Sequence, residues 1–588
     1  MNDTPAKSKF LKTIYRTAFI LSLIGVFAFI IDFGYEQSST IQRALNAFYL
    51  IILFLGIGAT LTRYFAEHIK RRKQVVLFDY ATIAVTLYII AIHFFGQEAH
   101  RHLSFFYDDN WIKVAILLTF IREFAEQKVS YKKSALNPAQ LFIVSFLGII
   151  LLGALLLMLP KATYEGISFL DALFTSTSAV CVTGLIVVDT GSYFTPFGQN
   201  IIVFLIQLGG LGILTFASYF SYFFKGVSSF ENQVILSDMN NSKKIGEVFS
   251  TLKRILLITF SIEIVGAFLI FLSLKSKVLP ELGDRIAFSI FHSISAFCNA
   301  GFSTLSNGLY DINYRYNYAL QLTLIALFVF GGLGFPIVIN VLRYLKYKII
   351  KPILNRNQKI DYKPWLLSLS SRITLITTSS LLVIGTLLVY INEYSNTLAE
   401  HDGLGKFVTA LFGAATPRTA GFNTVDMNQL HFSTLMLIFL LMWVGASPAS
   451  TGGGIKTSTF AIATLNFFSL AKGKTRIEVY RREIADISVR RAFAIISLSL
   501  VVIGFAVIAI SSFDSQKTLL SIAFECFSAY STVGLSLGIT SSLSAASKGV
   551  IIAVMFIGRV SMLTLMIALF RKVKQQAYRY PTEEILIN

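Results

Sequence analysis

The chain has 588 residues, of which 54% are hydrophobic and only 14% are charged, and its mean hydropathy is +0.66. Such a composition excludes a soluble multidomain enzyme, whose water-facing surface needs many more charged residues. The formal net charge of +19 does not indicate a nucleic-acid-binding protein, because the basic residues lie in connectors between apolar runs rather than on one face. Apolar runs of about 20 residues recur along the chain, and the alternating pattern of a β-barrel is missing. We therefore expect an all-α integral membrane protein.

The first part of the chain carries four predicted transmembrane helices. They lie at residues 11–31, 44–65, 75–95 and 111–124. The positive-inside rule places the basic ends of these helices, and the basic connectors at residues 343–363 and 472–491, in the cytoplasm, where anionic lipid headgroups are their expected partner. Four crossings return the chain to the cytoplasm, so residues 1–134 are predicted to form an N-terminal bundle ahead of a second domain at residues 135–588.

Four helices before a second membrane domain raise the hypothesis of a voltage sensor. Such a sensor needs several regularly spaced cationic residues on its fourth helix, and only Lys113 and Arg122 occur near that helix. An accessory or dimer-flanking bundle is therefore the favoured interpretation. Within this bundle, Arg63 and Asp79 are expected to pair, because a charge inside a membrane is costly unless it has a partner.

The second domain contains a fourfold internal repeat. A polar segment with a glycine recurs at Gly184, Gly301, Gly421 and Gly534, at separations of 117, 120 and 113 residues. Similar separations indicate repeated structural units, here at about residues 138–225, 245–348, 364–471 and 489–574. The apolar stretch before each glycine is too short to span a membrane. Each stretch is therefore predicted to be a re-entrant helix that enters from the outside and stops midway.

The polar segments have the chemistry of a potassium filter. A ring of backbone carbonyl oxygens can replace the hydration shell of K⁺ without any fixed charge. Glycine permits the unusual backbone angles that such a ring needs, and the carbonyl end of each short helix carries partial negative charge that favours a cation. No acidic residue lies in the four segments VTG, NAG, TAG and TVG, so the acidic ring of many other cation pores is missing. Four segments around a pseudo-fourfold axis predict one K⁺-selective pore.

Four stretches carry a resemblance to a known family: VCVTGLIVVDTGSYFTPFGQ, FHSISAFCNAGFST, ATPRTAGFNTVDM and FSAYSTVGLSLGIT. They resemble the filter regions of the Trk/Ktr/HKT superfamily of potassium transporters, in particular its bacterial TrkH/KtrB-type membrane subunits, and the resemblance extends from about residue 136 to the C-terminus. It implies four units of helix, pore helix, filter and helix around one pore. The filter residues that it implies are Val182, Thr183, Gly184, Asn299, Ala300, Gly301, Thr419, Ala420, Gly421, Thr532, Val533 and Gly534. Glycine rather than serine at position 184 implies K⁺ over Na⁺ at the filter carbonyls.

Two further segments resemble the gate of this superfamily. WVGASPASTGGGIKTST resembles an intramembrane loop below the filter, with gate residues Gly452, Gly453, Gly454 and Lys456. Its small residues hold a regular helix poorly. FIGRVSMLTLM places Arg559 inside an apolar helix, and the resemblance implies that it faces the pore as an electrostatic barrier. A structural arginine that binds loop carbonyls is the alternative.

The second helices of the repeats raise two more questions. Ser561 and Met562 stand where relatives commonly have Gly-Pro, which leaves the local helix geometry open. The similar segments QLGGLGILTF and FGGLGFPIV carry glycines that allow close packing or a kink. No ion-binding role is assigned to these glycines.

The resemblance implies potassium uptake through a gated pore in a bacterial inner membrane. It also implies a homodimer that sits on a cytoplasmic ring of nucleotide-binding RCK subunits of the TrkA or KtrA type. No catalytic residue or tightly bound cofactor is expected. The alternative is Na⁺- or H⁺-coupled symport, for which Glu263, His292 and Glu525 lie in or near apolar segments. A membrane-embedded enzyme is the remote alternative, because the seven histidines are scattered.

Overall fold

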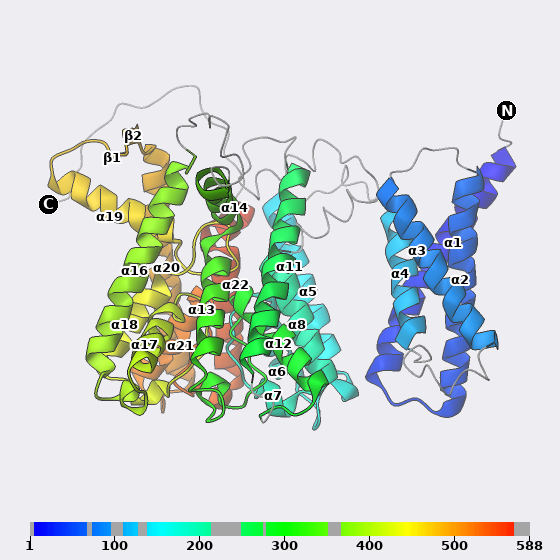
Figure 1. The fold of residues 1–588 in the computed structure, drawn as a ribbon, viewed down its shortest axis with the longest axis horizontal. Helices are drawn as coiled ribbons and strands as arrows, with labels where there is room; N and C mark the ends of the chain where they lie inside the picture. The colour runs from blue at the N-terminus through cyan, green and yellow to red at the C-terminus, as the bar shows by residue number, and fades with distance from the viewer. Residues whose placement is uncertain are drawn as a thin grey trace.

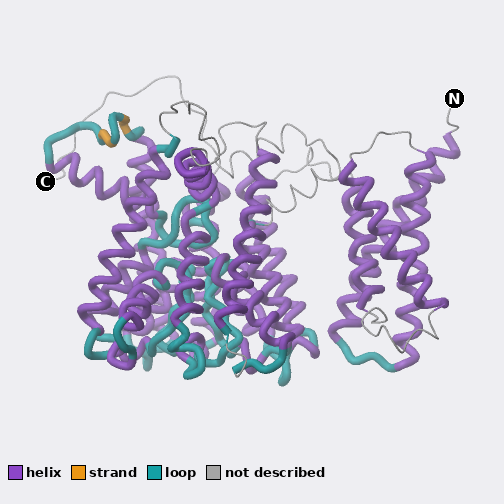
Figure 2. Tube along the Cα trace, in the orientation of Figure 1, coloured by secondary structure: helices purple, strands orange, loops and turns teal. Residues whose placement is uncertain are grey.

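The computed structural model describes residues 5–66, 73–95, 110–126, 138–212, 248–274, 278–350 and 366–569. Within these ranges the secondary structure is helical apart from isolated bridges and a two-stranded hairpin, β1 (Glu478–Val479) and β2 (Arg482–Glu483). Figure 1 shows the first four helices standing beside a larger helical body. Loops run through the middle of this body as well as over its ends (Figure 2). The expected all-α fold is therefore confirmed.

The N-terminal bundle consists of four antiparallel helices (Figure 1). They are α1 (Pro5–Gly34), α2 (Ser39–Ala66), α3 (Lys73–Phe95) and α4 (Asn110–Glu126). Each helix covers the range predicted from the apolar runs and extends beyond it at one or both ends. A buried apolar cluster that includes Tyr49, Leu53 and Ile116 packs the helices together. The outer end of α1 touches the larger body, where the rings of Phe33 and Phe197 lie 4.8 Å apart.

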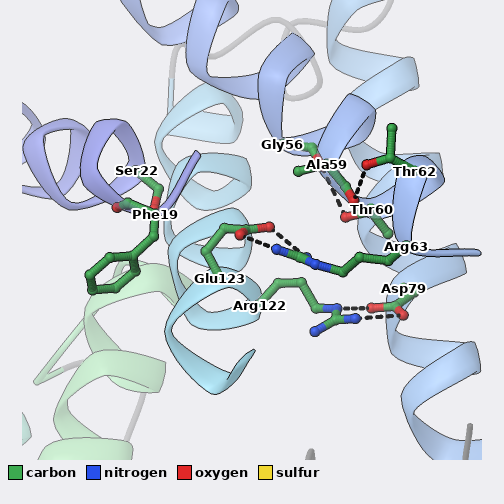
Figure 3. Close-up of polar contacts among 10 residues, drawn as sticks. All are labelled: Phe19, Ser22, Gly56, Ala59, Thr60, Thr62, Arg63, Asp79, Arg122 and Glu123. Atoms are coloured by element: carbon green, nitrogen blue, oxygen red, sulfur yellow. Dashed lines mark hydrogen bonds and ion pairs between the residues drawn. The ribbon is translucent and has the colours of Figure 1, made fainter. Parts of the chain in front are cut away.

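The buried charges of this bundle do not pair as expected, and the predicted Arg63–Asp79 pair is wrong. Arg63 on α2 donates to both carboxylate oxygens of Glu123 on α4, whereas Asp79 on α3 accepts from Arg122 on α4 (Figure 3). All four side chains are at most 2% exposed. The physical reason is that α4 carries adjacent residues of opposite charge, whose side chains diverge toward α2 and α3.

The larger body is built from four units, each with a long first helix, a short helix and a second helix. Unit one contains α5 (Pro138–Leu157), α6 (Phe169–Val180), the single turn α7 (Thr190–Tyr193) and α8 (Pro196–Leu211); unit two contains α11 (Val248–Ser273), α12 (Leu282–Phe297), α13 (Tyr318–Leu333) and α14 (Phe335–Leu345); unit three contains α16 (Leu369–Glu393), α17 (Leu404–Ala415), α18 (Phe432–Trp443) and α19 (Thr457–Ala471); unit four contains α20 (Asp486–Phe513), α21 (Leu519–Ser531), α22 (Ala545–Val560) and α23 (Met562–Leu569). The predicted boundaries near residues 134, 225, 245, 364 and 574 lie outside the described residues.

The short helices are half-length, as predicted. α6, α12, α17 and α21 have 12, 16, 12 and 13 residues. At 1.5 Å per residue they reach about 18 to 24 Å, which is less than the hydrocarbon thickness of about 30 Å. Among the described residues, five helices are long and apolar enough to cross a membrane, or six if α13 and the bent continuation at α14 count as one span.

Three of the four second helices end at one equivalent position. α8 ends at Gly212 and α13 gives way to α14 at Gly334, where φ is +76° and +83°, and the axes of α13 and α14 differ by 107°. α22 gives way to α23 at Ser561, whose φ is +74° although the residue is not glycine. The helix is therefore interrupted here without a glycine at position 561 or a proline at position 562. In unit three, a loop at residues 444–456 separates α18 from α19.

The paired glycines of α8 and α13 provide close packing, and Gly334 adds the kink between α13 and α14. A Cβ at Gly209 or at Gly331 would overlap the last carbonyl of the short helix in its own unit, at Val180 and Phe297 respectively. A Cβ at Gly558 in α22 would likewise overlap the carbonyl of Tyr530, the next-to-last residue of α21. Glycine therefore lets the second helix lie directly against the end of the short helix, next to the predicted filter.

Candidate ion-conduction site

The four predicted filter segments share one unusual backbone conformation. In each, the residue two positions before the glycine has a positive φ: 57° at Val182, 60° at Asn299, 75° at Thr419 and 50° at Thr532. The glycines themselves have φ of 91°, 71°, 77° and 91° in chain order. A residue with a side chain in this region costs of the order of 1–3 kcal/mol and is held there only by its surroundings, commonly at functional sites. Because the four outliers occupy equivalent positions, the four segments share one backbone conformation. Sequence reasoning predicted the unusual angles only for the glycines.

The glycines close the four segments into a ring. A Cβ at Gly184 would overlap the carbonyl oxygen of Ala300 in unit two, and one at Gly301 would lie 2.9 Å from that of Ala420 in unit three. A Cβ at Gly421 would overlap the carbonyl of Val533 in unit four, and one at Gly534 that of Thr183 in unit one. The order of the units around the ring is therefore their order in the chain, and units two and four are opposite each other. Eight of the twelve predicted filter residues, the glycines and the residues directly before them, make these contacts, and the four residues with positive φ come immediately before them in the chain.

Hydroxyl groups of the short helices hold the filter strands from behind. Ser178 and Ser528 accept hydrogen bonds from the backbone N–H of Gly184 and Gly534 at 3.0 and 3.1 Å. Ser295 and Thr416 donate to the carbonyls of Phe302 and Phe422 at 2.8 and 2.6 Å. Sequence reasoning did not identify these residues. The available signal was a serine six residues before the glycine in three units, and a threonine five residues before it in the other.

The filter opens on one side into a wide cavity. This outer vestibule has a volume of about 610 Å³, and all four filter glycines line it together with Asp189 and Asp426. Two carboxylates beside a concave entrance raise the local concentration of cations. The negative charge thus lies in the vestibule, whereas the filter segments themselves offer backbone carbonyls.

The loop at residues 444–456 lies against the opposite side of the filter. A Cβ at Gly452 would overlap the hydroxyl of Thr419, and one at Gly453 would overlap that of Thr532. The hydroxyl of Thr451 bonds the side chain of Asn299 at 3.3 Å. The loop therefore contacts the filter of units two, three and four, at the residues with positive φ. The start and end of the loop pair with each other in a parallel bridge between Val444 and Ile455.

Three cationic side chains hold this loop. Lys456 donates to the carbonyls of Gly452 and Gly453 at 2.7 and 3.4 Å, and so closes the loop on itself. Arg559 donates to the carbonyl of Thr451 and, at 2.6 Å, to the carbonyl of Gly209 in α8. Arg559 therefore makes the contacts expected of a structural arginine that binds loop carbonyls. Its role as an electrostatic barrier to ions stays a prediction.

The third cation, Arg418, is a residue to which sequence reasoning gave no role. It is 8% exposed and lies within hydrogen-bonding distance of the carbonyls of Thr378 and Gly445, at 3.4 and 3.5 Å. The signal in the sequence was a charge in a polar segment between two apolar runs. Arg418 therefore connects the filter of unit three to the beginning of the loop.

The three titratable residues proposed for coupling are buried beside the filter region rather than gathered in one cluster. Glu263 on α11 accepts a hydrogen bond from Gln207 on α8 at 3.2 Å. His292 on α12 and Glu525 on α21 each bond a serine that follows the filter of the same unit. In the described part of the chain, no group of three or more His, Cys, Asp or Glu side chains is arranged to hold a metal ion.

Comparisons with known proteins agree with this architecture. The family model named TrkH, described as a cation transport protein, matches residues 109–579. Ktr system potassium uptake protein B of Bacillus subtilis (strain 168) is 37% identical over 453 residues, which cover 76% of this chain and 96% of the relative. Potassium/sodium uptake protein NtpJ of Enterococcus hirae is 35% identical over 465 residues, covering 77% and 98%. The crystal structure of the potassium transporter TrkH from Vibrio parahaemolyticus matches with a TM-score of 0.59 at 18% identity, covering 84% of this chain and 98% of that chain.

The solved structure supports the fold, and the relatives support the family. The relatives named above are potassium uptake proteins, so the family is one of transporters and not of enzymes. The family match begins at residue 109 and so leaves out α1 to α3. Because the family model covers most of the chain and the fold is the same all-α membrane pore, this chain belongs to the TrkH/KtrB family of potassium uptake transporters.

Proposed function

We propose that this protein takes up potassium across the cytoplasmic membrane of a bacterium through a gated, K⁺-selective pore. The observation that carries the proposal is the closed ring of four filter segments with equivalent positive φ angles. The carbonyls of Thr183, Ala300, Ala420 and Val533 would replace the hydration shell of K⁺ there. The membrane potential would drive uptake, since it is worth about 2.3 kcal/mol per charge for each 100 mV.

The loop below the filter is the proposed gate. It reaches the filter through Gly452 and Gly453, and Arg559 connects it to the second helices of units one and four. A positive charge at this place would also repel K⁺ until the loop moves. Opening therefore requires the loss of the contacts that Arg559 and Lys456 make with loop carbonyls.

A cytoplasmic partner would control this gate. The name of the Bacillus relative describes a component of a Ktr system, which supports a partner subunit. We propose that the partner is an RCK ring of the TrkA or KtrA type, and that the protein is a homodimer on this ring. The basic connectors at residues 343–363 and 472–491 are the proposed contacts. Residues 1–134 would be an accessory bundle beside the pore domain at residues 135–588, and no tightly bound cofactor is proposed.

The test is uptake of Rb⁺ tracer into proteoliposomes that hold the full chain. We expect external K⁺ to compete with Rb⁺ and Na⁺ not to compete. In Gly421→Ser this discrimination should be lost, because the new side chain would overlap the carbonyl of Val533 at a φ of +77°. Gly549→Ser is the matched control, since a Cβ at Gly549 has open space around it. An unchanged K⁺ preference in Gly421→Ser would overturn the filter assignment.

Coupled symport is the second candidate. It is supported by the name of the Enterococcus relative, which includes sodium, and by Glu263, a carboxyl 5% exposed inside the helical body. A pore takes up Rb⁺ whenever the potential is inside-negative. A symporter needs in addition an inward gradient of Na⁺ or H⁺, and its uptake should cease in Glu263→Gln. The same proteoliposomes therefore separate the two candidates.

A further inference from the structure

Two of the four filter units have a buried titratable side chain at one equivalent position. His292 on α12 and Glu525 on α21 each lie nine residues before the filter glycine of their unit. The corresponding residues in units one and three are Thr175 and Phe412. His292 is fully buried and Glu525 is 1% exposed. Because units two and four are opposite each other in the ring, the two titratable residues lie behind the filter along one diagonal.

Both residues bind the chain segment that leaves the filter. The serine two positions after the glycine contacts them: Ser303 lies 3.0 Å from Nε2 of His292, and Ser536 donates to a carboxylate oxygen of Glu525. Nδ1 of His292 lies 2.9 Å from the carbonyl of Phe288, which can only accept, so Nδ1 carries a proton. Nε2 of the neutral imidazole is then the acceptor for the serine hydroxyl. In both units the serine therefore donates toward the short helix.

The same serines hold the wall of the outer vestibule. The hydroxyl oxygen of Ser303 accepts from the N–H of Leu305 at 3.1 Å, and that of Ser536 accepts from the N–H of Gly538 at 2.8 Å. All four of these residues line the vestibule. Units two and four thus each have a continuous hydrogen-bonded path. It runs from a buried side chain, through one serine hydroxyl, to the backbone at the outer mouth of the filter.

Units one and three have no equivalent path among the described residues. The hydroxyl of Thr175 donates to the carbonyl of Asp171 in its own helix at 2.9 Å, and Ile186 stands where the serine would be. Phe412 and Asn423 occupy the two positions in unit three. Glu525 makes the more extensive set of contacts, because it also accepts from Thr540 at 3.0 Å.

We propose that Glu525 and His292 are positioning residues that set the K⁺ over Na⁺ selectivity of the pore by fixing the outer mouth of the filter across the diagonal between units two and four. The inference rests on the proposed function. A carbonyl ring discriminates between ions through the number and the spacing of its oxygens. Side chains that lock the strands of two opposite units therefore restrict how far the ring can adjust to the smaller ion.

The experiment measures the external K⁺ and Na⁺ concentrations that halve Rb⁺ uptake into proteoliposomes of the full chain. In Glu525→Leu the ratio of the Na⁺ to the K⁺ concentration should fall about tenfold, the factor that corresponds to loss of one hydrogen bond to a charged group. Glu525→Gln keeps an accepting oxygen and should retain most of the selectivity. Thr175→Val is the matched control at the equivalent position of unit one, and its ratio should stay at the wild-type value.

A second variant keeps the test decisive if Glu525→Leu does not fold. Ser536→Ala removes one of the two hydroxyls, with that of Thr540, that connect Glu525 to the vestibule, and should lower the ratio in the same direction as Glu525→Leu. The double variant should be no less selective than Glu525→Leu alone, because that change already interrupts the path through Ser536. An unchanged ratio in Ser536→Ala or in folded Glu525→Leu, or an equal fall in Thr175→Val, would overturn the inference. A wild-type protein without K⁺ preference would instead overturn the proposed function.

Discussion

The guanidinium of Arg559 donates a hydrogen bond to the backbone carbonyl of Thr451, 108 positions earlier in the chain. Its other terminal nitrogen donates to the carbonyl of Gly209 in unit one at 2.6 Å. A single side chain of unit four thus joins the loop of unit three to the second helix of unit one. The equivalent residues in units one and two are Gly210 and Gly332. The positive charge of Arg559 therefore breaks the fourfold symmetry at the place where the loop of unit three contacts unit four.

Replacement of Arg559 should open the pore. Arg559→Gln removes the positive charge and weakens the attachment of the loop, so the rate of Rb⁺ uptake per folded protein should rise about tenfold, which corresponds to one lost hydrogen bond from a charged group. Arg559→Lys keeps the charge but offers no guanidinium fork to bridge the two carbonyls, and should give an intermediate rate. A wild-type rate in Arg559→Gln would show that this residue restrains neither the ion nor the loop.

The glycines of the loop should not tolerate even one added methyl group. In Gly453→Ala the new Cβ would overlap the side chain of Thr532, a filter residue, so uptake of Rb⁺ should drop to background. Overpacking at such a contact should also lower the free energy of unfolding by about 1–3 kcal/mol.

Gly504→Ala in α20 is the control for this loop variant. A Cβ at Gly504 has open space around it, so uptake should be unaffected. The thermal midpoint of the control should stay the same or rise, because alanine favours a helix by up to about 1 kcal/mol relative to glycine. Normal Rb⁺ uptake by Gly453→Ala would contradict the close contact between the loop and Thr532 of the filter.

The crossed ion pairs of the N-terminal bundle should behave as two independent units. Arg63→Leu leaves Glu123 buried without its partner and should lower the free energy of unfolding by about 3–5 kcal/mol. The double variant Arg63→Leu/Glu123→Leu should recover most of this loss, since no unpaired charge remains. These differences are measured as the yield of folded protein and its thermal midpoint in detergent.

A mismatched double variant distinguishes the crossed pairs from the pairing expected from sequence. Arg63→Leu/Asp79→Leu removes one member of each observed pair, so that Glu123 loses its ion pair with Arg63 and Arg122 loses its ion pair with Asp79. It should therefore be less stable than Arg63→Leu alone. Recovery in this variant, and not in Arg63→Leu/Glu123→Leu, would contradict the arrangement in Figure 3.

Ser561 should be replaceable by glycine with a gain in stability. Its φ of +74° lies in the left-handed region, which costs a residue with a Cβ about 1–2 kcal/mol. Ser561→Gly should therefore raise the free energy of unfolding by about 1 kcal/mol and leave Rb⁺ uptake intact. Ser561→Val should lower stability, because a β-branched residue fits this region worse still. A loss of stability in Ser561→Gly would show that the hydroxyl matters more than the backbone conformation.

Local patterns in the sequence were enough to predict much of this architecture. The four N-terminal helices, the half-length helices before Gly184, Gly301, Gly421 and Gly534, and the unwound loop at residues 444–456 were all expected. Each depends on a property of neighbouring residues: an apolar run of a certain length, or a cluster of small residues that forms no stable helix. The spacing of the four glycines added the fourfold repeat.

Pairwise relationships between distant residues could not be predicted in the same way. The expectation that Arg63 pairs with Asp79 failed, because α4 supplies a partner of opposite charge to each of them. The hydrogen bonds of His292 and Glu525 to Ser303 and Ser536 also depend on how the filter strand folds back beside its short helix. Composition and periodicity hold no information about such contacts.

The sequence by itself determined that the protein lies in a membrane and that four similar units form one pore, and it predicted which glycines mark the filter, because hydropathy and repetition are written along the chain. Only the tertiary structure decided the order of the units around the ring, the left-handed conformation of Val182, Asn299, Thr419 and Thr532, and the attachment of the loop by Arg559. These features arise where backbones from different units approach so closely that a carbonyl of one faces a glycine of the next. That constraint exists only after the four units have packed together.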